Sequence, residues 1–191
     1  MEGLIVVWDT PERVFKVEPD ELTPQERTFE LYSLNGEPKG KVVVERFQHR
    51  HKSQLSISET PWGKIEISNE ISDPGSFKVV ANGREIASFK KKMTGKLIVN
   101  FSGLQEITFK SINRICEVNC DFGRFRIMGS DLKNQIKPEF LETLEKRAKS
   151  RDPPSVFWGF AIVGPCILRK EDFYSVMLTY SCHDFLEIVR M

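Results

Sequence analysis

The C-terminal segment 171–189 restricts the fold of this chain more than any other part of the sequence. When the segment is drawn as an α-helix, its large apolar side chains form two stripes that together cover most of the circumference. The first stripe consists of Phe173, Val176, Met177 and Tyr180, and the second of Tyr174, Leu178, Cys182, Phe185 and Val189. A helix that is apolar all round belongs in a protein interior. We therefore predict a buried helix near 171–189; the alternative is that 173–181 forms one more strand of a sheet.

Residues 1 to about 130 have the pattern of short β-strands. Apolar and polar side chains alternate, and Gly, Pro or Asn interrupts the alternation at short intervals, which is typical of antiparallel hairpins. Strands are predicted at 4–8, 28–34, 41–47, 55–58, 64–68, 77–81, 85–89, 96–101, 107–110, 115–119 and 124–128. Asn35-Gly36 and Asn82-Gly83 each predict a type I′ turn, because these residues accept its two positive φ angles. Thr23-Pro24-Gln25-Glu26 instead predicts a short helical turn.

The pattern changes after Gly129. Residues 138–149 carry apolar side chains on one face and Pro138 at the first helical position, which predicts an amphipathic helix. The segment 155–163 is apolar on both faces, which is typical of a strand that is covered from both sides. We predict one mainly β domain over 1–191, in which an antiparallel meander of about ten or more short strands closes as a barrel or a sandwich. The two helices and the apolar strand of 131–191 complete the same core.

Charge and targeting patterns restrict the partners and the compartment. The chain has 28 basic and 27 acidic residues and a net charge of +1, so any affinity for nucleic acid or a membrane must come from a local patch. The N-terminal apolar run is short and follows an acidic residue, so we expect no signal peptide. The most apolar segment, 155–168, is too short for a transmembrane helix. We expect a soluble cytoplasmic protein whose four cysteines are reduced.

Two basic clusters stand out against the nearly neutral total. The first surrounds Phe47 and consists of Arg46, His49, Arg50, His51 and Lys52; the second consists of Lys90, Lys91, Lys92 and Lys96. Basic clusters on a β-surface can hold phosphate groups through charge-assisted hydrogen bonds. The alternative is a solvated hairpin end whose lysines keep strand edges from pairing. Nucleic acid is a less favoured ligand, because stacking aromatic residues are scarce beside these lysines.

Patterns for catalysis and metal binding are sparse. His49 and His51 would share one face of a strand, which is a usable metal geometry, but no third ligand is nearby and a solvated strand end is the simpler interpretation. The four cysteines, Cys116, Cys120, Cys166 and Cys182, could in principle supply four thiolates, although buried apolar cysteines are commoner. The sequence carries no P-loop, dinucleotide-binding, hydrolase or metalloprotease motif. We therefore assign no catalytic residue, no metal and no cofactor.

The hairpin 77–87 is followed by Phe89-Lys90-Lys91-Lys92, which gives the order strand, Asn-Gly turn, strand and basic tail. Together with the apolar C-terminal helix, this order resembles the group that contains the tubby C-terminal domain, LURP-one and the phospholipid scramblases, in outline over 40–191. The resemblance implies about a dozen strands wrapped around a hydrophobic C-terminal helix, with phosphoinositide or other anionic lipid headgroups as ligands. The helix 138–149 departs from the simplest version of that plan. Neither a scramblase calcium segment nor the tubby terminal sequence is found, so no site residue is carried over.

These observations favour a non-enzymatic binding or scaffold domain. We expect it to recognise an anionic lipid headgroup or a protein partner through the local basic residues. One alternative is an oligomeric structural protein with a Phe-rich interface. The other is a small enzyme with a cryptic site that uses His49, His51 or a cysteine.

Overall fold

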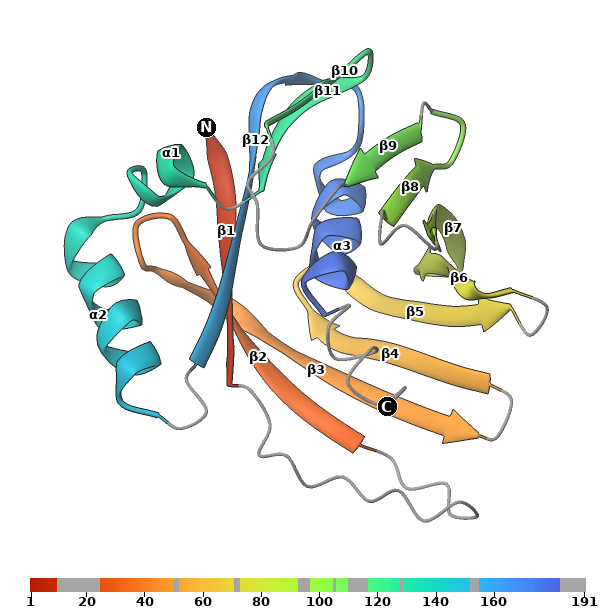
Figure 1. Ribbon diagram of the computed structural model, residues 1–191, viewed down its shortest axis with the longest axis horizontal. Helices are drawn as coiled ribbons and strands as arrows, with labels where there is room; N and C mark the ends of the chain where they lie inside the picture. The colour runs from red at the N-terminus through yellow and green to blue at the C-terminus, as the bar shows by residue number, and fades with distance from the viewer. Residues whose placement is uncertain are drawn as a thin grey trace.

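The computed structural model describes residues 1–9, 25–49, 52–70, 73–92, 97–104, 106–109, 117–127, 129–151 and 155–182. Within them, twelve strands form a single sheet in which neighbouring strands are antiparallel, and the sheet curls into a nearly closed barrel (Figure 1). The strands are β1 (Glu2–Asp9), β2 (Gln25–Ser33), β3 (Pro38–His49), β4 (Lys52–Thr60), β5 (Gly63–Glu70), β6 (Asp73–Ala81), β7 (Arg84–Lys91), β8 (Leu97–Phe101), β9 (Glu106–Phe109), β10 (Glu117–Cys120), β11 (Gly123–Ile127) and β12 (Ser155–Cys166).

The described residues also form three helices, α1 (Ser130–Lys133), α2 (Pro138–Lys149) and α3 (Lys170–Ser181). The curved sheet encloses α3, whereas α2 lies outside the barrel (Figure 1). The predicted mainly β fold is confirmed, and α2 has the bounds that the sequence pattern predicts. Of the two closures considered, the barrel is correct, because all twelve strands belong to one sheet.

The order of strands brings the first and the last strand of the chain side by side. The sheet runs β10-β11-β12-β1-β2 and then in sequence to β9, so β12 lies between β11 and β1. The first and last strands therefore pair along the whole of β1, from Glu2 opposite Ile162 to Asp9 opposite Ser155. Among the described strands, β9 and β10 end the sheet, and no pairing between them closes the barrel.

The helix α3 is the centre of the core. Every residue from Phe173 to Cys182 is buried, as expected for a helix that is apolar on all sides. The buried residues include three small polar side chains, Ser175, Thr179 and Ser181. Two of these, Thr179 and Ser181, donate hydrogen bonds to carbonyl oxygens one turn earlier, so their hydroxyls need no partner from the sheet. The ring of Phe173 stacks on Phe125 of β11 with centroids 4.6 Å apart. The predicted buried helix is confirmed and the strand alternative is wrong; residues 183–189 of the prediction lie outside the described part of the chain.

A second, smaller core lies on the outer face of the sheet, under α2. It contains Ile5 and Val7 of β1 together with Leu144 of α2, and Phe157 of β12 packs against it. The alternate residues Leu4, Val6 and Trp8 belong to the interior core. Because β1 and β12 are covered by α3 on one face and by α2 on the other, both faces of these strands must be apolar.

The two predicted type I′ turns have different outcomes. Asn82 and Gly83 both have positive φ, 50° and 76°, which confirms this turn. In the other loop only Gly36 has positive φ, 82°, and its N–H donates to the Ser33 carbonyl. The Ser33 N–H also donates to the Glu37 carbonyl, so the hydrogen bonds close a loop of three residues, 34–36, and the type I′ prediction is wrong.

The packing of α2 explains the three-residue loop. A Cβ on Gly36 would lie 2.7 Å from the ring of Phe140, so the loop is shaped by its contact with α2. The predicted helical turn at 23–26 is also wrong where it can be compared, because Gln25 and Glu26 already belong to β2. The rest of that turn lies outside the described residues.

An ion pair on the outer face joins α2 to the sheet. Arg147 Nη1 lies 2.6 Å from Glu30 Oε2, and the Tyr32 hydroxyl donates to the same oxygen at 3.0 Å. The hydrogen bond from Arg147 lowers the pKa of the Glu30 carboxyl below its ordinary value of 4.5. Tyr32 also packs on Phe140, with ring centroids 4.9 Å apart. Charge and packing thus hold α2 at the same place on β2.

The central position of α3 predicts a large cost for shortening its buried side chains. Phe173→Ala should lower the free energy of unfolding by about 3–5 kcal/mol, because it leaves a cavity in a core that can relax only in part. Ile167→Ala is the matched control: this side chain is 73% exposed and its loss should change stability by less than about 0.5 kcal/mol. Urea denaturation followed by tryptophan fluorescence measures both.

Truncation after Arg169 tests the same packing more severely. Without α3 the inward apolar side chains of the sheet have nothing to pack against. The product should therefore be insoluble, or it should bind the dye ANS and unfold without cooperativity. A truncated chain that is soluble and unfolds cooperatively would mean that the barrel does not need the helix.

The pair between Arg147 and Glu30 predicts a dependence of stability on pH. A carboxyl whose pKa is lowered by folding stabilises the protein above its unfolded pKa, and this stabilisation is lost as the pH falls through the folded pKa. Arg147→Met should therefore cost at most about 1 kcal/mol at pH 7, since both side chains are about one-third exposed, and the difference from the wild type should vanish well below pH 4.5. Lys146→Met, which breaks the exposed pair with Glu142, should have little effect at either pH.

Candidate functional site

Antiparallel pairing places alternate connections at opposite ends of the barrel. One end, which we call the mouth, holds the β2–β3, β4–β5 and β6–β7 turns (34–37, 61–62 and 82–83) and the first turn of α3. The other end, which we call the basic end, holds the end of β3, the start of β4 and the end of β7 (46–49, 52 and 90–92). The described residues of both predicted basic clusters map to the basic end.

The second cluster forms the end of β7. Lys90 and Lys91 are its last two residues, Lys92 follows directly, and all three side chains are exposed. Lys90 lies opposite Ser76 of β6 and Ile98 of β8. Lys96 lies outside the described residues.

The described residues of the first cluster lie at the end of β3 and the start of β4. Arg46 and His49 belong to β3 and Lys52 to β4, with His49 paired to Lys52 across the hairpin. Arg50, His51 and the side chains of Arg46, His49 and Lys52 lie outside the described part of the structure.

The two clusters do not form one compact patch. Lys52 lies on β4, and two strands, β5 and β6, separate β4 from β7. At about 4.8 Å per strand spacing, the nearest described members of the two clusters are therefore about 14 Å apart along the sheet. Their described residues occupy the same end of the barrel without adjoining each other along the sheet.

The described cysteines lie in environments that suppress their reactivity. Cys120, Cys166 and Cys182 are free thiols, and burial raises the pKa of all three. Cys182 lies inside the barrel and is 1% exposed. Cys120 is partly buried, and its thiol donates a hydrogen bond to the Gly123 carbonyl at 3.1 Å. Cys116 lies outside the described residues, among which no group of three His, Cys, Asp or Glu side chains is placed to hold a metal.

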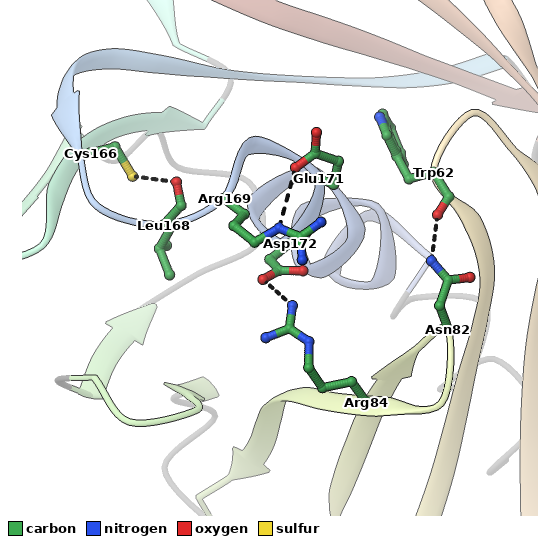
Figure 2. Close-up of polar contacts among 8 residues, drawn as sticks. All are labelled: Trp62, Asn82, Arg84, Cys166, Leu168, Arg169, Glu171 and Asp172. Carbon is green, nitrogen blue, oxygen red and sulfur yellow. Dashed lines mark hydrogen bonds and ion pairs between the residues drawn. The ribbon is translucent and has the colours of Figure 1, made fainter.

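At the mouth, one ion pair joins α3 to the β6–β7 hairpin, and one hydrogen bond joins that hairpin to the β4–β5 turn (Figure 2). Arg84, directly after the β6–β7 turn, reaches Asp172 in the first turn of α3 with 2.6 Å between Nη2 and Oδ2. Asn82 Nδ2 donates to the Trp62 carbonyl at 2.9 Å, which joins that turn to the β4–β5 turn. Lys170, the first residue of α3, forms an ion pair with Glu2 of β1. Asp172 also lies where the helix dipole favours a negative charge.

A cleft of about 690 Å³ opens beside these contacts. Its lining comes from β1, the β2–β3 loop, the β4–β5 turn, the segment between α1 and α2, and α3: Met1, Glu2, Gly3, Leu4, Ser33, Leu34, Asn35, Glu37, Lys39, Pro61, Trp62, Gln135 and Tyr174. The ring of Trp62 stacks on Tyr174, with centroids 5.5 Å apart and planes inclined by 24°. None of these residues belongs to the basic clusters that the sequence singles out.

Sequence reasoning missed this cleft because each contribution looks ordinary in isolation. Trp62 stands in a Pro-Trp-Gly turn, where it reads as a strand separator, and Tyr174 reads as one more apolar residue of the buried helix. A tryptophan inside a tight turn, where small and polar residues are usual, is the one local signal that could have drawn attention to the site.

Comparison of the chain with models of known protein families, with curated proteins and with solved structures found no match. The resemblance to the tubby-like group therefore stays a prediction. In the described part of the chain, no helix has the length and apolar content needed to cross a bilayer.

The environments of the cysteines predict an order of labelling. In the native protein at pH 8, Cys182 should resist iodoacetamide, since the thiolate is the reacting form and this thiol is buried and protonated. Cys120 and Cys166, which are only partly buried, should be modified sooner, and all sites should react in guanidinium chloride. Peptide mass spectrometry at successive times resolves each site, and fast labelling of Cys182 in the native state would contradict its placement inside the barrel.

Proposed function

We propose that this protein is a non-enzymatic binding domain that recognises an anionic headgroup with Lys90, Lys91 and Lys92 at the basic end. The observation that carries the proposal is the position of these lysines: three consecutive exposed side chains end a strand whose preceding residues are fixed in the core. Ala87 and Phe89 are each 1% exposed, and Phe89 stacks on Phe77 with ring centroids 4.8 Å apart. The proposed site is thus attached to a rigid element.

Strand geometry places the lysine side chains on both faces of the sheet at the end of β7. Ala87 and Phe89 point into the barrel, so the alternation of a strand directs Ser88 and Lys90 outward and places Lys91 on the same side as Phe89. A rim with ammonium groups on both sides suits a multivalent phosphate better than a single flat anion, because each ammonium acts as a separate point charge.

A membrane surface is the favoured source of the anion. Near an anionic bilayer each lysine contributes about 1 kcal/mol of binding, so three lysines give a weak, salt-sensitive interaction. The overall charge of +1 adds almost nothing. The resemblance to the tubby-like group favours the same class of ligand, and a cytoplasmic location belongs to this proposal because anionic lipids face the cytoplasm.

Two features favour binding over catalysis in this proposal. The interior of the barrel is filled by α3 and its aromatic partners, so a ligand must bind at a surface. The described thiols are held in the protonated form by burial, which makes them poor nucleophiles.

Association with a protein partner or a second copy is the second candidate. The sheet ends at β9 and β10, and an edge strand can pair with a strand of another chain. Light scattering that shows a stable oligomer at low salt and high salt alike would favour this candidate.

Replacing the three lysines tests the headgroup proposal. The wild type should co-sediment with vesicles of phosphatidylcholine containing a phosphoinositide, and less with phosphatidylcholine alone. Lys90→Gln, Lys91→Gln and Lys92→Gln together should weaken this binding by about 3 kcal/mol, which is more than a hundredfold. The remaining binding should fall further with added salt.

The matched control changes the same amount of charge elsewhere. Lys133, Lys146 and Lys149 are exposed around α2, and their joint replacement by Gln should leave vesicle binding within about twofold of the wild type if attraction is local. Equal losses in the two triple variants, or a wild type that ignores anionic vesicles, would contradict the proposal.

A further inference from the structure

The cleft at the mouth is a second site, on the opposite end of the barrel from the lysines and independent of them. We propose that it binds a small uncharged molecule that has a flat apolar face and a hydrogen-bond acceptor on its edge. Its size fits this class: about 690 Å³ lies within the range of small-molecule sites in proteins, about 300–1,000 Å³. The residues of the lining indicate the other three properties of the ligand, which are its flat face, its lack of charge and its hydrogen-bond acceptor.

The apolar part of the lining is flat and held in place. Trp62 and Tyr174 stack on each other, and the Trp62 backbone is fixed on both sides: its N–H donates to Thr60 Oγ1 at 3.1 Å and its carbonyl accepts from Asn82. Aromatic surfaces fixed in this way favour a planar ligand, since little conformational entropy is lost on binding.

The opposite wall is equally fixed. The β2–β3 loop contacts Phe140 at Gly36, and the Leu34 carbonyl accepts a hydrogen bond from the Lys137 N–H at 3.0 Å. Ser33 Oγ accepts from the N–H groups of Asn35 and Glu37 within the loop. The cleft therefore exists before any ligand arrives, as most small-molecule sites do.

The acidic side chains of the lining are already neutralised. Glu2 pairs with Lys170, and Glu37 pairs with Lys39, with 3.1 Å between Oε2 and Nζ. A charged ligand would have to compete with these pairs and lose its own hydration. An uncharged ligand meets neither cost.

One buried polar group of the lining has no partner among the described residues. The hydroxyl of Tyr174 is buried and makes no hydrogen bond to the described residues, and the residue is 5% exposed. Burial and the nearby charge of Glu2 raise the pKa of this phenol, so the group stays protonated and can donate. A buried donor without an acceptor is unfavourable, and a carbonyl oxygen or ring nitrogen of a ligand would satisfy it.

Three indole derivatives of similar shape test separately the flat apolar face, the hydrogen-bond acceptor and the lack of charge that we propose for the ligand. Indole-3-carboxamide carries an acceptor, indole-3-carboxylate adds a negative charge, and 3-methylindole has neither. We expect saturable shifts in the amide NMR resonances of Asn35, Gly36 and Gln135 with the carboxamide, and binding weaker by about tenfold with the carboxylate. Titration of the ¹⁵N-labelled full chain measures all three affinities.

Tyr174→Phe removes the hydroxyl and keeps the ring. It should weaken binding of the carboxamide by about two- to tenfold, leave the affinity for 3-methylindole unchanged, and leave the unliganded protein at least as stable as the wild type. Asn35→Trp, at an exposed loop position, should fill the cleft and abolish binding without affecting the core. The triple Lys90, Lys91 and Lys92 variant should bind all three compounds normally, so failure of the vesicle experiment leaves this one interpretable.

Three results would overturn the inference. The first is the absence of saturable shifts with any of the compounds, and the second is binding that persists in Asn35→Trp. The third is a loss of stability in Tyr174→Phe, which would mean that the hydroxyl already has a partner, such as a bound water.

Discussion

The burial of α3 inside the sheet is the interaction on which the rest of the structure depends. A sheet of twelve strands encloses more space than its own inward side chains can fill, and an all-round apolar helix needs a surface on every side. The helix therefore fills the space inside the sheet, and the sheet covers the apolar surface of the helix. Phe173 shows this directly, since it packs on Phe125 of β11 and on Phe160 of β12. With the interior filled, ligands must bind at the ends of the barrel or along its outer face.

Local patterns were sufficient to predict most of the elements. The helix 138–149, the hairpin at Asn82-Gly83 and the two-sided burial of 155–163 all follow from residue periodicity and turn chemistry within a few neighbouring residues. The prediction at Asn35-Gly36 was wrong because a distant residue decides that loop: Phe140 packs against Gly36. A pattern that covers four residues carries no information about a helix one hundred residues later.

The two candidate sites show the same limit. Lys90, Lys91 and Lys92 are consecutive and follow a predicted strand, so the sequence alone indicates this cluster and its place after that strand. Only the structure shows that they lie at the end of the barrel opposite the mouth. The cleft could not be predicted, because five separate segments contribute to it. Its polar character also depends on which carboxylates form ion pairs with lysines in the folded chain. Glu2 and Lys170 are far apart in the sequence and meet only because β12 returns the chain to β1.

The mouth also explains why an unpartnered hydroxyl can persist in a well-packed barrel. Leaving a buried donor without an acceptor costs about 1–3 kcal/mol, which is a large fraction of the stability of a small domain. Phenylalanine at position 174 would keep the stack on Trp62 and remove that cost. A side chain that lowers the stability of the fold without a structural benefit is expected at a functional site. The ion pairs around the first turn of α3, from Arg84 to Asp172 and from Lys170 to Glu2, hold this tyrosine in position. The same contacts that fix the helix in the barrel therefore also shape the cleft.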